Sequence, residues 1–111
     1  MADDVISRLA QIIHERRTAA PETSYTRQLI DGGPAKPAKK LGEEATETVI
    51  AAICEDDQRL KSEAADLIYH LLVVLECRAV PVADVLAELE RRLSMSGIAE
   101  KAARKPPNPP V

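Results

Sequence analysis

Apolar residues recur every three to four positions along most of the chain, which is the spacing of α-helices. The first such stretch covers residues 3–18, with helical spacing of the apolar residues Val5, Ile6, Leu9, Ile12 and Ile13. No stretch alternates apolar and polar residues as a half-buried strand would. The pattern predicts five helices: residues 3–18, a short helix capped by Thr23 or Ser24 that ends at Gly32 and Gly33, residues 37–54, a helix capped by Asp56 or Asp57 that runs to Arg78, and residues 82–94.

Prolines and glycines separate these predicted helices. Residues 32–40 (GGPAKPAKK) are expected to form a basic loop, with Pro37 in the first turn of the third helix. Pro81 precedes the fifth helix, whose apolar positions Val85, Leu86, Leu89 and Leu93 are expected to face inward. Short connections between helices favour an all-α four- to five-helix bundle over residues 1–104. A short final segment is expected at 98–104, and the Pro-rich tail 105–111 is expected to be disordered.

Composition supports the helical prediction. The chain has 111 residues, of which 2% are aromatic and none is Phe or Trp. Its core must therefore be built from Ala, Val, Ile and Leu, which suit closely packed helices better than a β-sandwich, whose strands favour aromatic residues.

Charge and hydrophobicity exclude several functional classes. A net charge of −3 does not favour a non-specific nucleic-acid surface. The longest uncharged apolar run, residues 67–75, is far shorter than the roughly 18 residues of a membrane span. The first residues carry acids where a signal peptide carries positive charge. We therefore expect a cytoplasmic protein without nucleic-acid or membrane partners, whose Cys54 and Cys77 are reduced thiols in the helical core.

Two of the predicted helices carry a single carboxylate within an apolar stretch. Glu47 is the only charged residue among residues 45–54, and Asp66 is the only formal charge among residues 64–75. An isolated carboxylate in such surroundings is costly unless something pairs with it. Each has an acidic companion three residues earlier, Glu44 and Glu63 respectively, so each pair projects from one side of its helix.

Antiparallel packing of the third and fourth helices, which their short connection implies, would bring the two pairs together. Four facing carboxylates cannot all stay ionised without a cation, and an all-oxygen donor set favours Mg²⁺ or Mn²⁺ over zinc or copper. We therefore predict a metal site of Glu44, Glu47, Glu63 and Asp66, with a solvated acidic face as the alternative. His70, four residues after Asp66, could support the ligands or simply fill space. Magnesium held by carboxylates leaves positions for substrate phosphates, as phosphoanhydride cleavage requires.

Basic and aromatic residues precede the first acidic pair. Lysines in a loop beside magnesium can hold phosphate oxygens, although solvated lysines near a helix start are equally common. Tyr25 could stack on a base, bond a ribose or simply pack. The candidate substrate-binding residues are Lys40, which lies one turn before Glu44, then Lys36, Lys39, Arg27 and Tyr25.

Four segments of the sequence carry a family resemblance: SYTRQLIDGG at 24–33, AKKLGEEATETVIAA at 38–52, LKSEAADLIYHLLVVL at 60–75 and DVLAELERRLSMSGIAEKAAR at 84–104. Together they resemble the phosphoribosyl-ATP pyrophosphohydrolases of histidine biosynthesis. These enzymes belong to the all-α, MazG-type nucleotide pyrophosphohydrolases, which share the paired EExxE and ExxD motifs. The likeness extends over roughly residues 5–104.

The resemblance implies a MazG-like bundle completed by homodimerisation, with Mg²⁺ on Glu44, Glu47, Glu63 and Asp66. It implies hydrolysis of phosphoribosyl-ATP to phosphoribosyl-AMP and pyrophosphate. For the mechanism, our hypothesis is that Glu43 or Glu44 orients or deprotonates the attacking water. Two alternatives stay open at this point. One is a house-cleaning nucleoside triphosphate pyrophosphohydrolase of the same superfamily, and the other is a non-catalytic helical dimerisation module.

Overall fold

The structure is a computed structural model that describes residues 4–18, 20, 24–94, 97, 101, 102 and 104. Its elements are α1 (Val5–Glu15), a 3-10 turn (Arg16–Thr18), α2 (Tyr25–Asp31), α3 (Ala35–Cys54), α4 (Asp57–Cys77) and α5 (Val82–Arg92). The all-α class is therefore confirmed, and the described residues contain no strand. Most of the expected final segment 98–104 and the whole tail 105–111 lie outside the described residues.

Short polar side chains cap three of the helices where the sequence places them. Asp4, Ser24 and Asp56 each accept a hydrogen bond from the backbone N–H three residues later, at 2.7, 3.1 and 2.8 Å respectively. These bonds satisfy N–H groups that have no partner within the helix. The starts of α1, α2 and α4 are therefore fixed locally by the sequence.

The start of α3 differs from the prediction. This helix begins at Ala35, two residues before Pro37, so most of the expected basic loop forms its first turns. A proline is tolerated there because the first four N–H groups of a helix lack intrahelical acceptors. Pro37 is almost completely buried, which anchors this end of α3.

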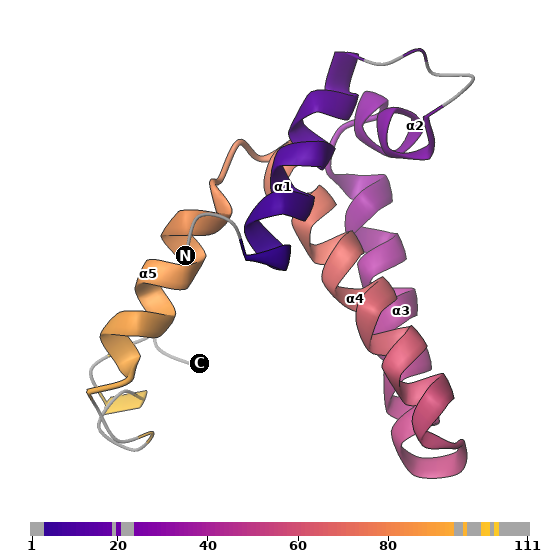
Figure 1. The fold of residues 1–111 in the computed structure, drawn as a ribbon, viewed down its shortest axis with the longest axis vertical. Coiled ribbons are helices and arrows are strands. Elements are labelled where there is room, and N and C mark those ends of the chain that lie inside the picture. The colour runs from indigo at the N-terminus through magenta and orange to yellow at the C-terminus, as the bar shows by residue number, and fades with distance from the viewer. Residues whose placement is uncertain are drawn as a thin grey trace, which may run out of the picture.

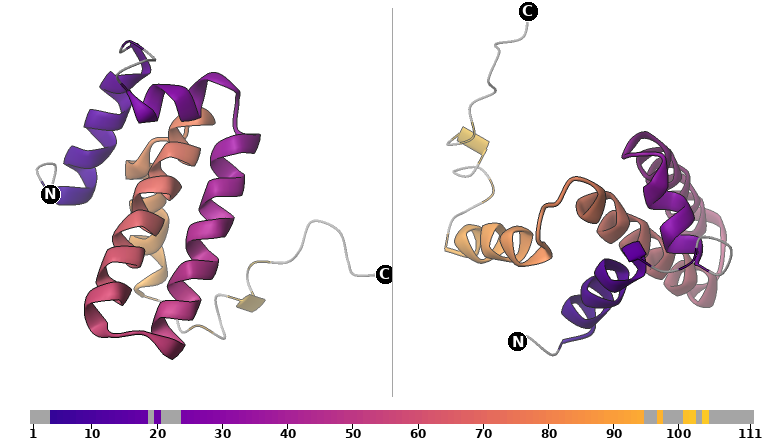
Figure 2. Two further views of the ribbon diagram at one scale, coloured as in Figure 1. Left: turned by 90° about the vertical axis from the view of Figure 1, so that its right-hand side faces the viewer. Right: turned by 90° about the horizontal axis from the view of Figure 1, so that it is seen from above.

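The longest helices, α3 and α4, form an antiparallel hairpin joined at residues 55–56 (Figures 1 and 2). α1 packs against α4, and α2 contacts both α3 and α4 near the start of α3. The buried core lies where α1, α2 and the second half of α4 meet, and it consists of Ile13, Leu29, Leu72 and Val73. The helices that surround this core hold one end of the hairpin, whereas the opposite end projects from it (Figure 1).

Several apolar residues expected in the interior are exposed. α5 points away from the hairpin (Figure 1), and Leu86, Leu89 and Leu93 are 37%, 52% and 80% exposed. The expectation that they face inward is wrong for the single chain, because helical periodicity identifies an apolar face but not the surface that covers it. The projecting end of the hairpin likewise exposes Val49 and Ile53.

Two smaller expectations concern cysteines and membranes. Both cysteines are free thiols, but Cys54 is exposed and only Cys77 is half-buried, so the core position predicted for Cys54 is wrong. Cys54 is the last residue of α3, at the projecting end of the hairpin. None of the helices in the described ranges is both long enough and apolar enough to cross a membrane.

Candidate metal centre

Three carboxylates from the two long helices converge at the middle of the hairpin. Glu44 on α3 and Glu63 and Asp66 on α4 each offer an oxygen within 4.8 Å of the others. Glu44 and Glu63 are buried, at 8% and 7% exposure, whereas Asp66 is exposed. We call these three residues the carboxylate cluster.

The backbone around the cluster is tied together by Thr48. Its hydroxyl lies 2.7 Å from the carbonyl oxygen of Glu44 and 3.2 Å from that of Glu63. The first contact is one turn back along α3, and the second crosses to α4. A small polar side chain thus sets the spacing of the two helices at the level of the acids.

The electrostatics of the cluster disfavour its charged form. Burial raises the pKa of the Glu44 carboxyl, and a hydrogen bond with Glu47 and repulsion from Glu47 and Asp66 raise it further. Burial and repulsion from Glu47 also raise the pKa of Glu63, while the Arg59 guanidinium, 3.4 Å from the Glu63 carboxylate, opposes the rise. Glu47 therefore borders the cluster, although its own side chain is exposed.

The burial pattern reverses one premise of the sequence argument. Glu47 and Asp66 were expected to be the carboxylates stranded among apolar residues, yet in the single chain both are exposed and their companions Glu44 and Glu63 are buried. The apolar neighbours of Glu47, such as Val49 and Ile50, are exposed as well. The periodicity places each pair on one side of a helix, but the rotation of that helix depends on tertiary packing.

A converging set of carboxylates, in which the pKa values of Glu44 and Glu63 are raised, suits a hard divalent cation. Such a cation accepts oxygen donors and compensates the mutual repulsion of the acids. The absence of histidine or cysteine among the three donors argues against a site built for zinc. The donor set therefore fits a divalent metal.

Lys40 lies beside the cluster. Its ammonium nitrogen is 3.4 Å from a carboxylate oxygen of Glu43 and 4.0 Å from one of Glu44. Nearby Tyr25, followed by the hydrogen bond to Glu43, raises the pKa of Lys40. Because Tyr25 comes from α2, three helices contribute side chains to this region.

The other basic candidates lie farther out. Lys36 and Lys39 are exposed on the first turns of α3, and within the described part of the chain neither forms an ion pair. Arg27 contacts Asp31 one turn later on α2, with Nε and Oδ1 2.8 Å apart. The structure thus places Lys40 next to Glu44, with Tyr25 near Lys40.

Sequence reasoning did not assign a role to Thr48 or Arg59. The position of Arg59, four residues before Glu63, is a signal that could have identified it, because such residues meet on one helical face. Thr48 offers no comparable signal, because its second contact lies on another helix.

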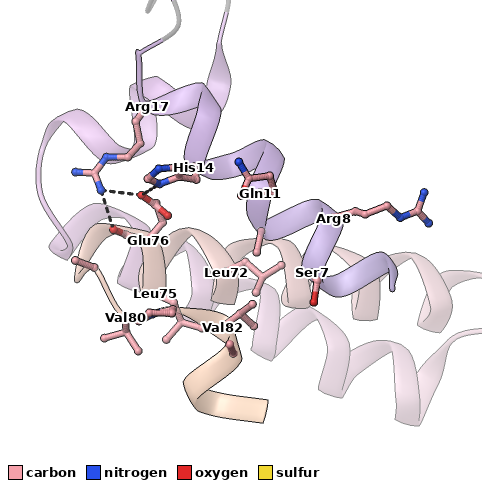
Figure 3. Close-up of a pocket in the computed structure, with 14 residues that line it drawn as sticks. Ser7, Arg8, Gln11, His14, Arg17, Leu72, Leu75, Glu76, Val80 and Val82 are labelled. Carbon is pink, nitrogen blue, oxygen red and sulfur yellow. Dashed lines mark hydrogen bonds and ion pairs between the residues drawn. The ribbon is translucent and has the colours of Figure 1, made fainter. Parts of the chain in front are cut away.

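A separate cleft of about 780 Å³ lies between α1, the end of α4 and the start of α5. Figure 3 shows its apolar floor, which includes Leu72, Leu75 and Val82. The side chains of Arg17, His14 and Glu76 meet at one end. None of the carboxylate-cluster residues lines it, so the acids form a distinct site.

Comparisons with known proteins give a consistent result. The family model described as phosphoribosyl-ATP pyrophosphohydrolase matches residues 6–93. The chain is 55% identical over 107 residues to the phosphoribosyl-ATP pyrophosphatase of Methylobacterium nodulans, covering 96% of this chain and 100% of that protein. The protein of the same name from Rhizobium meliloti is 56% identical with the same coverage. That from Cereibacter sphaeroides is 54% identical over 100 residues, which are 90% of this chain and 97% of the relative.

Proposed function

This chain belongs to the phosphoribosyl-ATP pyrophosphohydrolase family, and we propose that it hydrolyses phosphoribosyl-ATP to phosphoribosyl-AMP and pyrophosphate in histidine biosynthesis. The observation that carries the proposal is the carboxylate cluster, which lies inside the region matched to the family. A buried group of like charges has no stabilising role alone, but it fits a reaction that needs a divalent cation beside phosphates.

Glu44, Glu47, Glu63 and Asp66 would hold Mg²⁺, or Mn²⁺ in its place. The three members of the cluster approach one another within 4.8 Å, and Glu47 borders Glu44 through a hydrogen bond. A bound ion of this kind polarises the phosphoanhydride and offsets its negative charge. Its binding would remove the repulsion that raises the pKa values of Glu44 and Glu63.

The protein's own groups bind the substrate and activate water. Lys40 binds phosphate oxygens beside the acids, and the exposed Lys36 and Lys39 extend that positive charge along α3. Tyr25 and Arg27 on α2 contact the rest of the nucleotide. Glu43 or Glu44 orients the attacking water and takes its proton, while the anhydride between the α- and β-phosphates breaks and pyrophosphate leaves intact.

We also propose that the chain acts as a homodimer. The hairpin that carries the acids exposes Val49, Ile50 and Ile53, and α5 exposes a further apolar stripe. A second copy packed on the hairpin would surround the exposed Glu47 and Asp66 with the apolar environment that the sequence indicates. Contiguous exposed apolar surface of this kind is typical of an interface.

Pyrophosphate release from phosphoribosyl-ATP, measured with and without Mg²⁺, tests the activity. We expect release only with the metal, and we expect Asp66→Ala to abolish it while Glu90→Ala, at an exposed position on α5, leaves it unchanged. A rate for Asp66→Ala within about tenfold of wild type would contradict the assignment. A panel of ordinary nucleoside triphosphates separates this activity from house-cleaning hydrolysis, and we expect slower turnover of every one of them.

A further inference from the structure

His70 is a buried polar residue that the proposed mechanism leaves without a role. It lies on α4 one turn after Asp66 and is 6% exposed. A buried imidazole needs a partner for each ring nitrogen. Nδ1 lies 2.8 Å from the backbone carbonyl oxygen of Asp66, and Nε2 lies 3.4 Å from the hydroxyl oxygen of Tyr25 on α2.

The chemistry of these partners fixes the direction of each hydrogen bond. A carbonyl oxygen can only accept, so Nδ1 must carry the hydrogen. In the neutral ring Nε2 is then an acceptor, and the Tyr25 hydroxyl donates to it. The Tyr25 oxygen then keeps its lone pairs for other donors.

Aromatic packing fixes the ring of Tyr25 in addition to its hydroxyl. Tyr25 stacks on Tyr69 with ring centroids 6.3 Å apart and an interplanar angle of 18°. The His70 ring is nearly perpendicular to both, at centroid distances of 5.0 Å from Tyr69 and 6.2 Å from Tyr25. Tyr69 is held in turn by a hydrogen bond with Thr26. Tyr25 is nevertheless 51% exposed, so part of a fixed aromatic ring is open to a ligand.

We propose that His70 is a positioning residue that holds Tyr25 in place to contact the nucleoside part of the substrate while the carboxylate cluster holds the phosphates. This inference rests on the proposed function. In it, the contact between His70 on α4 and Tyr25 on α2 joins the two helices at the proposed site. Aromatic rings that keep one surface open suit stacking against a base or a ribose. The contact of 3.4 Å is long for such a bond, and we expect it to shorten when substrate binds.

A double-mutant cycle between Tyr25 and His70 tests the connection. Tyr25→Phe removes the hydroxyl, and His70→Asn keeps a donor near the place of Nδ1 but loses the acceptor at Nε2. We expect each variant to raise KM for phosphoribosyl-ATP about fivefold to tenfold, as loss of one hydrogen bond would, with kcat within about twofold of wild type. The double variant should be no worse than either single one, because both remove the same interaction.

Two further variants separate positioning from a purely structural role. His70→Gln places an acceptor near the position of Nε2 and should restore KM to within about threefold of wild type. Glu76→Gln breaks an ion pair with Arg17 that lies outside the proposed site, and it should lower the melting temperature without changing KM. If His70→Asn fails to fold, His70→Leu takes its place in the cycle, because it also removes the acceptor at Nε2 while it fills most of the same volume.

Effects of Tyr25→Phe and His70→Asn that simply add would overturn the inference. So would a folded His70→Asn protein whose melting temperature falls while KM stays unchanged. Either result with an active wild-type enzyme leaves the proposed function standing. Absence of pyrophosphate release by the wild-type protein would instead remove the proposed function and this inference together.

Discussion

Glu44 and Glu63 are carboxylates held out of water beside other acids, and their raised pKa values record the cost of that position. Replacing either charge with a neutral side chain of the same shape removes repulsion from Glu47 and Asp66. The same replacement would also remove an oxygen from the proposed metal site. Metal-free stability and metal binding are therefore opposed at these two residues.

Glu44→Gln should accordingly have opposite effects in two conditions. In EDTA we expect its melting temperature to exceed that of wild type, because one of the repelling charges is gone. With Mg²⁺ at about 100 times Kd, the wild-type protein should gain about 2.7 kcal/mol of stability, and the variant much less. Thermal unfolding in both buffers measures this, with the exposed Glu90→Gln as the control. An equal magnesium response in the two proteins would exclude Glu44 as a ligand.

At the scale of residues, the sequence predicted which acids gather but not which of them are buried. The three-residue spacing brings Glu44 near Glu47 and Glu63 near Asp66 on their helices, and the hairpin joins the pairs. The buried members could not be predicted because helix rotation depends on contacts such as the bridge from Thr48 to the Glu63 carbonyl. His70 could be placed beside Asp66 by spacing, but its contact with Tyr25 depends on α2.

At the scale of elements, the end of α4 contains a strained residue. Ala79 follows the helix with a φ of 55°, and the N–H of Val80 bonds the carbonyl oxygen of Leu75 at 2.9 Å. This is a left-handed helix end, which glycine adopts without the steric cost of a Cβ atom.

Ala79→Gly should therefore stabilise the protein by about 0.5–1 kcal/mol. The matched control is Ala87→Gly, the same change within α5, which should destabilise it by a similar amount because glycine is a poor helix former. Urea unfolding of the three proteins gives the comparison. Destabilisation by Ala79→Gly would show that the turn does not carry the strain.

The attachment of α1 to α4 should depend on pH. Burial would raise the pKa of Glu76, but hydrogen bonds from Arg17 and His14 hold it below its ordinary value. Arg17 lies 2.7 Å and His14 3.0 Å from the same carboxylate oxygen (Figure 3). A lowered carboxyl pKa means that the pair stabilises the fold above the pKa of the unfolded chain and stops doing so as pH falls through the folded value.

Glu76→Gln should thus lower the free energy of unfolding by on the order of 1 kcal/mol at pH 7, a modest amount because the ion pair with Arg17 is partly exposed. In strong acid the same substitution should change it by almost nothing. Urea unfolding across this pH range measures the difference between the two proteins. Glu90→Gln, on exposed α5, should show no such convergence. A difference that is constant with pH would mean that the loss comes from packing instead of charge.

Among the features of the helices, their positions along the chain were the most predictable, because N-cap residues and prolines act locally. Ser24 and Asp56 begin their helices as expected, and Pro81 precedes α5. α3 began earlier than expected because a proline in the first turn need not mark the helix start. The prediction that the apolar face of α5 points inward is wrong, because an apolar stripe does not identify the surface that will cover it.

At the scale of the whole molecule, a single chain leaves several large apolar side chains exposed that the sequence pattern places on buried faces. Ile53 is 76% exposed near the tip of the hairpin and Leu93 is 80% exposed just beyond α5. Burying such a side chain contributes about 1.5–3 kcal/mol, so pairing of two copies has a substantial driving force.

Ile53→Glu should weaken the proposed dimer, because it places a charge on the apolar surface of the hairpin. Sedimentation equilibrium should give a dimer for wild type and a shift toward monomer for this variant. The control Gln58→Glu adds the same charge at an exposed polar position in the first turn of α4 and should leave the assembly unchanged. A wild-type mass equal to one chain at micromolar concentration would reject the dimer.

The hairpin also has a consequence for how the protein folds. The acids of the carboxylate cluster come from neighbouring helices joined by residues 55–56, so their association closes only a short loop. Contacts that are local along the chain form quickly, whereas the core around Ile13 must wait for distant segments to arrive. If the carboxylate cluster binds magnesium as proposed, the ion finds its ligands as soon as this hairpin forms, and it would then act as a folding template before any catalytic step.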